Sequence, residues 1–212
     1  MLTLSDLYEK QKELDARIIK EKGLEGVDLL PNTVLALQVE IAELANEWRG
    51  FKHWSNNREP RREVKCHACR GRGYFEFGAD ADKEHCMYCE GSGVQEKDPL
   101  LEEYVDCLHF FLSIARQLDL PEDDLYIPDD MVEGETVVLF TELLHNVGMI
   151  NGHLFLYHEP ENIRSHQREH FRGALACFYG LGEQRLGFTF EQIAEAYMAK
   201  NAVNHARQSN GY

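Results

Sequence analysis

Apolar residues recur every three or four positions along most of this 212-residue chain, and one segment interrupts the pattern. This spacing is typical of α-helices with one buried face, whereas strands alternate every second residue. From residue 56 to 97, glycine, cysteine, arginine and short polar runs replace it. No segment reads as a sheet. We therefore predict an all-α helical bundle with a small inserted module.

Helix boundaries are suggested by capping residues. Asp98 can cap a helix whose first residue is Pro99, where the missing N–H costs nothing. Thr189 and Gln192 form a capping-box pattern. We expect a helical domain over 1–57 and 98–212 and an inserted module over 58–97. The expected helices span about 5–21, 31–49, 98–118, 133–158, 161–179 and 189–205.

The net charge of −15 limits the partners of the chain. It repels nucleic acid and anionic membranes, which proteins usually bind through Lys and Arg, and it suits a site for divalent cations. The beginning of the sequence lacks the pattern of a signal peptide, and no apolar run approaches the roughly 20 residues that span a bilayer. We expect a cytoplasmic protein with no membrane contact.

Two pairs of carboxylates lie at helical spacing. Glu40 and Glu43 are three residues apart, as are Glu103 and Asp106, so each pair shares a helix face, and Glu47 continues the first line. Such pairs are common on solvated helix faces. Apolar residues surround Glu103 and Asp106, however, and inward carboxylates cannot all stay ionised without a cation.

A hard divalent ion would supply this compensation. Mg2+ prefers oxygen ligands and often shares its shell with water and phosphate oxygens. Glu40, Glu43, Glu103 and Asp106 could hold two such ions, which would orient a triphosphate and activate water. Glu43 is the candidate that takes the proton of this water.

The last predicted helix carries polar residues on one face. Lys200, Asn204 and Arg207 follow one another at intervals of four and three residues and could donate to phosphate oxygens. A solvated helix end explains the same residues, because cations there favour the helix dipole.

The inserted segment contains two Cys-x-x-Cys pairs, which could close tetrahedral coordination around one Zn2+. Each pair lies in a CxxCxGxG unit that resembles the DnaJ-type zinc repeat. With all four positions filled by cysteine, we expect a structural ion. The four ligands are Cys66, Cys69, Cys86 and Cys89. The remaining cysteines, Cys107 and Cys177, read as ordinary buried thiols.

Basic residues gather around the first of these pairs. They could contact nucleic acid or an acidic protein, but solvated charge that offsets the acidic domain is the favoured interpretation. The cluster consists of Arg58, Arg61, Arg62, Lys65, Arg70 and Arg72.

Several motifs together resemble the dimeric dUTPases, a family of the all-α NTP pyrophosphatase superfamily that includes MazG-like enzymes. These are QKELD near the start, EIAELANEWRGFKHWS, EEYVDCLHFFLS, and the KN, N, RQ and GY elements of the last helix. The resemblance covers most of the chain except the insert and part of the middle helices. It implies a homodimer that hydrolyses dUTP to dUMP and diphosphate.

The resemblance also implies roles for individual residues. It matches the four carboxylates to the Mg2+ ligands and Glu43 to the residue that activates water. It further implies substrate contacts by Gln11, Trp54, Lys200, Asn201, Asn204, Arg207 and Tyr212, with Lys52 and His109 as less direct matches.

Asp15 departs from the pattern, because some members carry Asn beside the uracil and a carboxylate offers no amide donor. Two alternatives therefore remain open. One is a related pyrophosphatase for dCTP or a modified deoxynucleotide, and the other, of a different class, is a zinc-dependent module that binds nucleic acid or protein.

Overall fold

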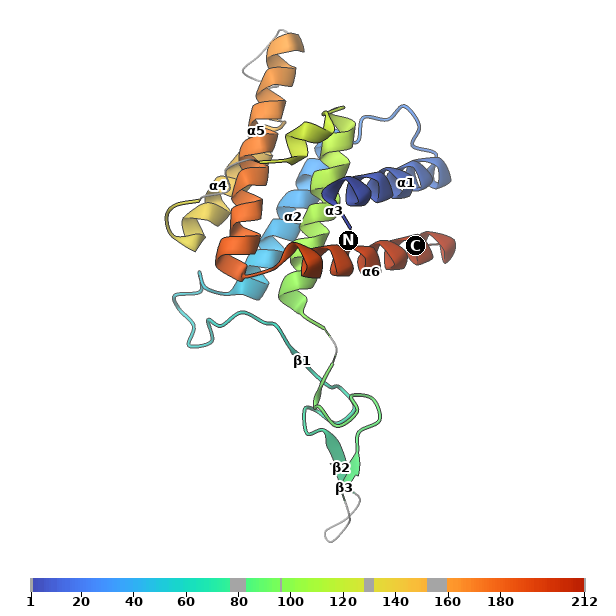
Figure 1. The fold of residues 1–212 in the computed structure, drawn as a ribbon, viewed down its shortest axis with the longest axis vertical. Helices are drawn as coiled ribbons and strands as arrows, with labels where there is room; N and C mark the ends of the chain where they lie inside the picture. The colour runs from blue at the N-terminus through green and yellow to red at the C-terminus, as the bar shows by residue number, and fades with distance from the viewer. Residues whose placement is uncertain (1, 77–82, 96, 128–131, 152–159, 212) are drawn as a thin grey trace.

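The computed structural model describes residues 2–76, 83–95, 97–127, 132–151 and 160–211, and most of these are helical (Figure 1). The predicted all-α fold is therefore confirmed. A 3-10 turn, Glu122–Leu125, precedes α4, and a π-helical segment, Leu181–Leu186, continues α5. The helices are α1 (Leu4–Lys22), α2 (Leu30–Trp48), α3 (Pro99–Gln117), α4 (Thr136–Met149), α5 (Pro160–Gly180) and α6 (Phe190–Ser209).

Helices α2 and α3 form the centre of the bundle (Figure 1). Helix α4 packs on α2 and on α5, while α1 and α6 lie side by side against α3. The core is closed by side chains that are fully buried, and it brings the carboxylate faces of α2 and α3 together. Its largest members include Leu37, Ile41, Leu44, Tyr104, Phe111, Phe171, Phe178 and Tyr197.

Capping residues fix the helix ends as the sequence suggested. The Asp98 side chain accepts from the Leu101 amide ahead of Pro99, and Thr189 forms its capping box with Gln192. A further capping box, between Thr3 and Asp6, begins α1 and had not been predicted. Each cap satisfies N–H groups that a helix start leaves without partners.

The expectation that no segment forms a sheet was wrong for the insert. Strand β1 (Val64–Lys65) pairs antiparallel with β4 (Val94–Gln95), and β2 (Tyr74–Glu76) pairs antiparallel with β3 (Lys83–His85). Strands of two or three residues are too short to show alternation in a sequence. They build an arm that projects from the end of the bundle where α2 stops and α3 begins (Figure 1).

The helix expected at 133–158 is shorter in the structure. Helix α4 covers Thr136–Met149, and residues 152–159 lie outside the part of the chain that the structure describes. Within the described residues, no helix is both long and apolar enough to cross a membrane.

Candidate active site and metal centres

Three glutamates meet where α2 packs against α3. Glu40, Glu43 and Glu103 each place a carboxylate oxygen within 4.8 Å of the others, and we call them the glutamate cluster. Glu43 is exposed, whereas Glu40 and Glu103 are half-buried. This arrangement follows from the three-residue spacing on α2 and from the packing of α2 on α3.

The electrostatics of the cluster favour a cation. Burial, followed by the charges of Asp106, Glu43 and Glu40, raises the pKa of Glu103 to about 7. Burial and the same kind of repulsion also raise the pKa of Glu40. Oxygen ligands at this density suit a hard divalent ion, so the residues fit Mg2+.

Asp106 lies beside the cluster but has a partner of its own. The Lys200 ammonium group donates a hydrogen bond to Asp106 Oδ2, which links α6 to α3. Asp106 still acts on the cluster, since its charge helps to raise the pKa of both Glu40 and Glu103. The four predicted carboxylates thus share one site, with Lys200 at its edge.

A cavity of ≈ 330 Å³ extends from this site along α3. Asp106, His109 and Ser113 line it at successive turns, and seven residues of helix span about 10 Å. Lys200, Asn204 and Arg207, which share one face of α6, form part of its wall. Its other lining residues include Gln11, Leu14, Asp15, Ile18, Glu40, Phe110 and Gln208.

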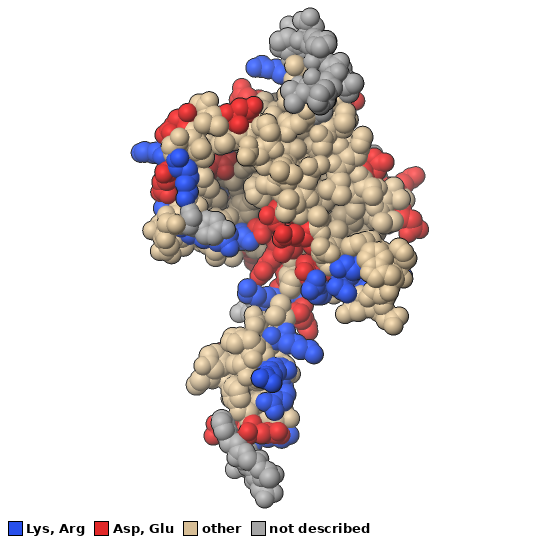
Figure 2. All heavy atoms as spheres, turned by 180° about the vertical axis from the view of Figure 1, so that it is seen from behind, with Lys and Arg blue, Asp and Glu red and all other residues tan. Residues whose placement is uncertain are grey.

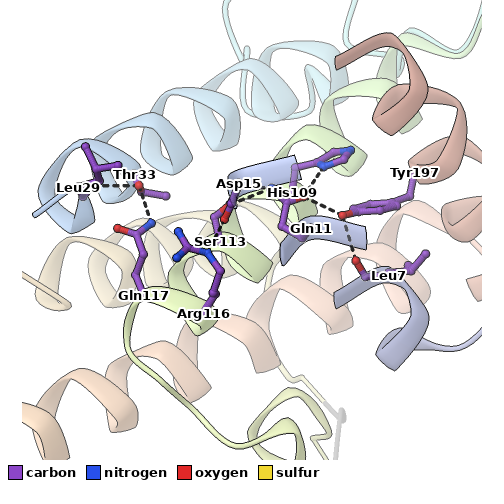
Figure 3. A network of polar contacts seen from close by, with 10 residues as sticks. All are labelled: Leu7, Gln11, Asp15, Leu29, Thr33, His109, Ser113, Arg116, Gln117 and Tyr197. Carbon is purple, nitrogen blue, oxygen red and sulfur yellow. Dashed lines mark hydrogen bonds and ion pairs between the residues drawn. The ribbon is translucent and has the colours of Figure 1, made fainter. Parts of the chain in front are cut away.

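A network of polar side chains contributes Gln11, Asp15, His109 and Ser113 to the lining of the cavity (Figure 3). Asp15 accepts hydrogen bonds from Gln11 Nε2 at 2.8 Å, from the Ser113 hydroxyl at 2.9 Å and from Arg116 Nε at 2.7 Å. Gln11 Nε2 also donates to Ser113 Oγ at 2.9 Å. An ionised carboxylate has no hydrogen to donate, so any further hydrogen bond that Asp15 forms must be one that it accepts.

This network determines the tautomer of His109. Because the amide nitrogen of Gln11 faces a carboxylate, Gln11 Oε1 faces His109 Nδ1 at 2.7 Å, and Nδ1 must carry the proton. Burial, and then the charge of Lys200, lowers the pKa of His109 to about 3, so the ring is neutral. Its Nε2 is a buried acceptor without a partner among the described residues.

Other predicted substrate residues lie elsewhere. Trp54 is 68% exposed and contacts Phe51 and His53 in the loop after α2, so it does not line the cavity with Gln11. The Lys52 ammonium lies over the Phe51 ring. Asn201 is buried in α6, and Tyr212 lies outside the described residues.

Three residues of the network were not predicted from the sequence, namely Ser113, Arg116 and Tyr197. Ser113 continues the line of Asp106 and His109 along α3 by one more turn, and following that line would have found it. Tyr197 lies one turn before Lys200 on α6, stacks on His109 with ring centroids 4.0 Å apart, and donates to Gln11 Oε1 at 2.7 Å.

The four cysteines of the arm form a second candidate metal centre. Their Sγ atoms lie within 4.8 Å of one another, and the pairs Cys66–Cys86 and Cys69–Cys89 are each separated by 3.8 Å. Tetrahedral Zn2+ with Zn–S bonds of about 2.3 Å would separate its sulfurs by about 3.8 Å. The residues therefore fit the predicted zinc ion.

The two cysteine loops contain equivalent hydrogen bonds from a glycine amide to a cysteine sulfur. The Gly73 amide donates to Cys69 Sγ at 3.2 Å, and the Gly93 amide donates to Cys89 Sγ at 3.3 Å. Both glycines have positive φ, and a Cβ on Gly73 would meet Gly91 O at 2.3 Å. Only glycine allows this turn and this close approach. Burial raises the pKa of the Cys69 thiol, but the Gly73 amide and the neighbouring sulfurs lower it below its usual range.

Basic side chains follow the arm, and acidic ones gather on the body near its base (Figure 2). Several of the basic residues are engaged within the chain. Arg58 donates to Gly50 O at 2.7 Å, Arg61 pairs with Glu47, and Arg62 contacts Asp98 and Leu186 O. These contacts attach the arm to the bundle, and they account for half of the predicted basic cluster.

The remaining two cysteines match their prediction in part. Cys107 is fully buried in α3, and burial raises its thiol pKa well above the usual range. Cys177 is only half-buried in α5, although burial raises its pKa as well.

Comparison with known protein families gives one match. A family model described as dUTPase matches residues 3–67 and 87–212, which include all four carboxylates and the polar network. The unmatched residues, 68–86, lie inside the arm. No curated protein matches the chain.

Proposed function

The chain belongs to the dUTPase family, and from this membership and its carboxylate site we propose that it hydrolyses dUTP to dUMP and diphosphate with Mg2+. The observation that carries the proposal is the glutamate cluster, whose member Glu40 lines the cavity together with Asp106 and Lys200. Negative ligands and a neighbouring cation are what a magnesium-bound triphosphate requires.

Glu40, Glu43, Glu103 and Asp106 would hold the metal, as one ion or two. Bound Mg2+ neutralises phosphate oxygens and lowers the pKa of a coordinated water. Glu43 is the exposed member of the cluster, so we assign it the proton of the attacking water. Lys200 and Arg207 would donate to the phosphates. Lys200 would thereby leave Asp106, whose carboxylate could then bind the metal.

The rest of the substrate would extend along the cavity toward the polar network. Gln11 and His109 would face the base or the sugar, and Asn204 would lie between them and the phosphates. Asn201, Trp54, Lys52 and Tyr212 remain proposed contacts on the family resemblance alone. For Trp54 to reach the base, the loop that follows α2 would have to move.

The decisive test is diphosphate release from each deoxynucleoside triphosphate, with and without Mg2+. We expect turnover of dUTP that requires Mg2+ and falls by about 100-fold or more in Glu43→Gln. Glu195→Gln, an exposed position on α6, is the matched control and should behave like the wild type. Full activity of Glu43→Gln would overturn the assignment.

One observation favours a second candidate substrate, dCTP or a modified cytosine nucleotide. All free hydrogen-bonding capacity of Asp15 is that of an acceptor, which suits an exocyclic amino group better than the O4 oxygen of uracil. We expect Asp15→Asn to shift the ratio of kcat/KM for dUTP and dCTP toward dUTP by about tenfold. An unchanged ratio would remove Asp15 from base selection.

We assign the arm a structural zinc ion held by its four cysteines. A binding module for nucleic acid or protein is the alternative of a different class, and it predicts the opposite result for mutants. In that case Glu43→Gln would leave function intact, while variants of the basic cluster such as Arg62→Ala would abolish it. The contacts of Arg61 and Arg62 with the bundle favour the enzyme.

We also propose a homodimer. Leu35 and Val39 lie one turn apart on α2 and are 62% and 48% exposed, and Val138 of the neighbouring α4 is 47% exposed. Exposed apolar side chains on helix surfaces are typical of interfaces between subunits. Light scattering should give twice the mass of one chain for the wild type and the mass of one chain for Leu35→Glu.

A further inference from the structure

Arg61 joins the two helices that carry the carboxylates. Its backbone N–H donates to Glu47 O at 2.9 Å in the last turn of α2, and its carbonyl accepts from the Leu100 amide at 3.2 Å in the first turn of α3. Helix ends leave such groups without intrahelical partners. One residue of the arm therefore satisfies a backbone group at each of the two helix ends and links α2 to α3 near the glutamate cluster.

The side chain of Arg61 is directed at Glu47. Arg61 Nε lies 2.8 Å from Glu47 Oε2, and the guanidinium also donates to Asn46 O at 3.4 Å. Glu47 Oε2 is buried and accepts no hydrogen bond from the described residues, so this ion pair is the contact that compensates its charge. The Glu47 side chain is 17% exposed.

Glu47 is a further carboxylate on the helix that carries Glu40 and Glu43, and it could compete with them for a metal ion. It follows Glu43 by four residues on α2, a spacing that brings side chains within about 5–6 Å at Cβ. It is nevertheless absent from the group of oxygens that approach one another in the glutamate cluster. Without a cation beside it, Glu47 would be a half-buried charge next to an ion that accepts carboxylates readily.

We propose that Arg61 is a positioning residue for the Mg2+ centre, which keeps Glu47 from becoming a ligand of the metal. The inference rests on the proposed function, because it assumes that the glutamate cluster holds the ion. It also gives the arm a role beyond its own fold, since Arg61 lies three residues before β1 and thereby connects the zinc module to the site of chemistry.

The consequence has a definite sign. Loss of the Arg61 charge should free Glu47, which would then compete with the glutamate cluster as a ligand for Mg2+. Mg2+ binding should become tighter by about tenfold, because the site gains a carboxylate and loses a cation. At the same time kcat should fall by about tenfold or more, because a displaced ion no longer aligns water and phosphate.

The test compares zinc-loaded wild type with Arg61→Ala, Glu47→Gln and the double variant. Mg2+ affinity is measured by calorimetry without nucleotide, and kcat by diphosphate release. Arg58→Ala is the matched control, because Arg58 belongs to the same arm and donates to a loop carbonyl, Gly50 O. We expect the double variant to return both quantities to within about twofold of the wild type, and Arg61→Lys to retain most of the effect of arginine.

Two results would overturn the proposal. A purely structural role would lower kcat without tightening Mg2+ binding, and Glu47→Gln would not rescue it. A large loss of Mg2+ affinity in Glu47→Gln alone would make Glu47 a ligand in the wild type. If Arg61→Ala loses zinc, it is replaced in the same comparison by Arg61→Met, which keeps the aliphatic part of the side chain.

The outcome is separable from the proposed reaction. If the wild type bound Mg2+ but hydrolysed no deoxynucleotide, the proposed function would fail. The calorimetric comparison of the four proteins would still decide whether Arg61 controls Glu47.

Discussion

The ammonium group of Lys200 donates a hydrogen bond to Asp106 Oδ2, so a cation from α6 occupies a carboxylate whose charge acts on the glutamate cluster. Lys200 and a metal ion would compete for this oxygen. The same lysine lines the cavity, where it can reach a phosphate once it leaves Asp106. In the proposed reaction, this contact would relate metal binding to substrate binding.

Lys200→Met should separate these two effects. Without the competing ammonium group, Mg2+ should bind the nucleotide-free protein more tightly, by about threefold to tenfold. The KM for the nucleotide should rise by about tenfold, because a phosphate donor is lost. Calorimetry and steady-state kinetics measure the two quantities. Lys20→Met, on the exposed end of α1, is the control, and weaker Mg2+ binding in Lys200→Met would contradict the prediction.

Mg2+ affinity should depend on pH through Glu103. Burial and the neighbouring carboxylates raise its pKa to about 7, so below that pH a proton competes with the metal. Affinity should increase as the pH rises from about 6 to 8. In Glu103→Gln affinity should be weaker and nearly independent of pH over this range. An equally steep dependence in that variant would assign the proton to another group.

Without metal, Glu103 should also affect folding. A carboxylate whose folded pKa exceeds its unfolded value of about 4.3 stabilises the fold below that value, and the contribution is lost as the pH rises through about 7. The Tm of the metal-free wild type should therefore decline between pH 5 and 7 more than that of Glu103→Gln. Saturating Mg2+ should remove the difference.

Removal of zinc should unfold the arm and spare the bundle. The arm has a small core, made of four cysteines with Ala68 and Phe75 packed against them, and the thiolates would repel one another once the metal is removed. A strong zinc chelator should open rapid trypsin cleavage between Arg58 and Lys97 while far-UV circular dichroism keeps most of its helical signal. Unchanged protease sensitivity would show that the arm is stable without the ion.

Asp124 should contribute to stability far from the active site. It is 1% exposed and accepts hydrogen bonds from Arg168 Nε at 2.6 Å and Arg172 Nη1 at 2.8 Å. Asp124→Asn should cost about 2 kcal/mol in urea unfolding at pH 7, whereas the exposed neighbour Asp123→Asn should cost little.

The pH dependence of this loss follows from the pKa. The hydrogen bond from Arg168, followed by that from Arg172, lowers the pKa of Asp124 despite its burial. Its stabilisation is present above the unfolded value of about 3.9 and is lost as the pH falls through the lower folded value. The difference between wild type and Asp124→Asn should thus be constant above about pH 5 and shrink toward pH 2.

The helices could be predicted because their signals are local. Apolar spacing and the caps at Asp98 and Thr189 lie within a few residues of the ends they define. The glutamate cluster followed from the same spacing on two helices. The short strands could not be predicted, since pairing between Val64 and Gln95 depends on cysteines that bring distant residues together.

Contacts between residues that are distant in the sequence could not be predicted either. Nothing near Glu47 in the sequence indicates that Arg61, fourteen residues later, neutralises it. Likewise, the meeting of Gln11 with Ser113 and Tyr197 depends on how α1 packs on α3 and α6. The position of Trp54 differs from the expectation because it lies on a loop, whose path the helical pattern does not determine.

The pairing of β1 with β4 brings the entry and exit of the arm side by side, with Val64 opposite Gln95 and Lys65 opposite Val94. Where it joins the bundle, the insertion therefore resembles a hairpin whose two strands keep a fixed separation. A lineage could exchange, lengthen or delete what lies beyond this pair without altering the distance between α2 and α3. The same pair is a natural place for protein engineers to graft a sensor or an affinity module onto the enzyme.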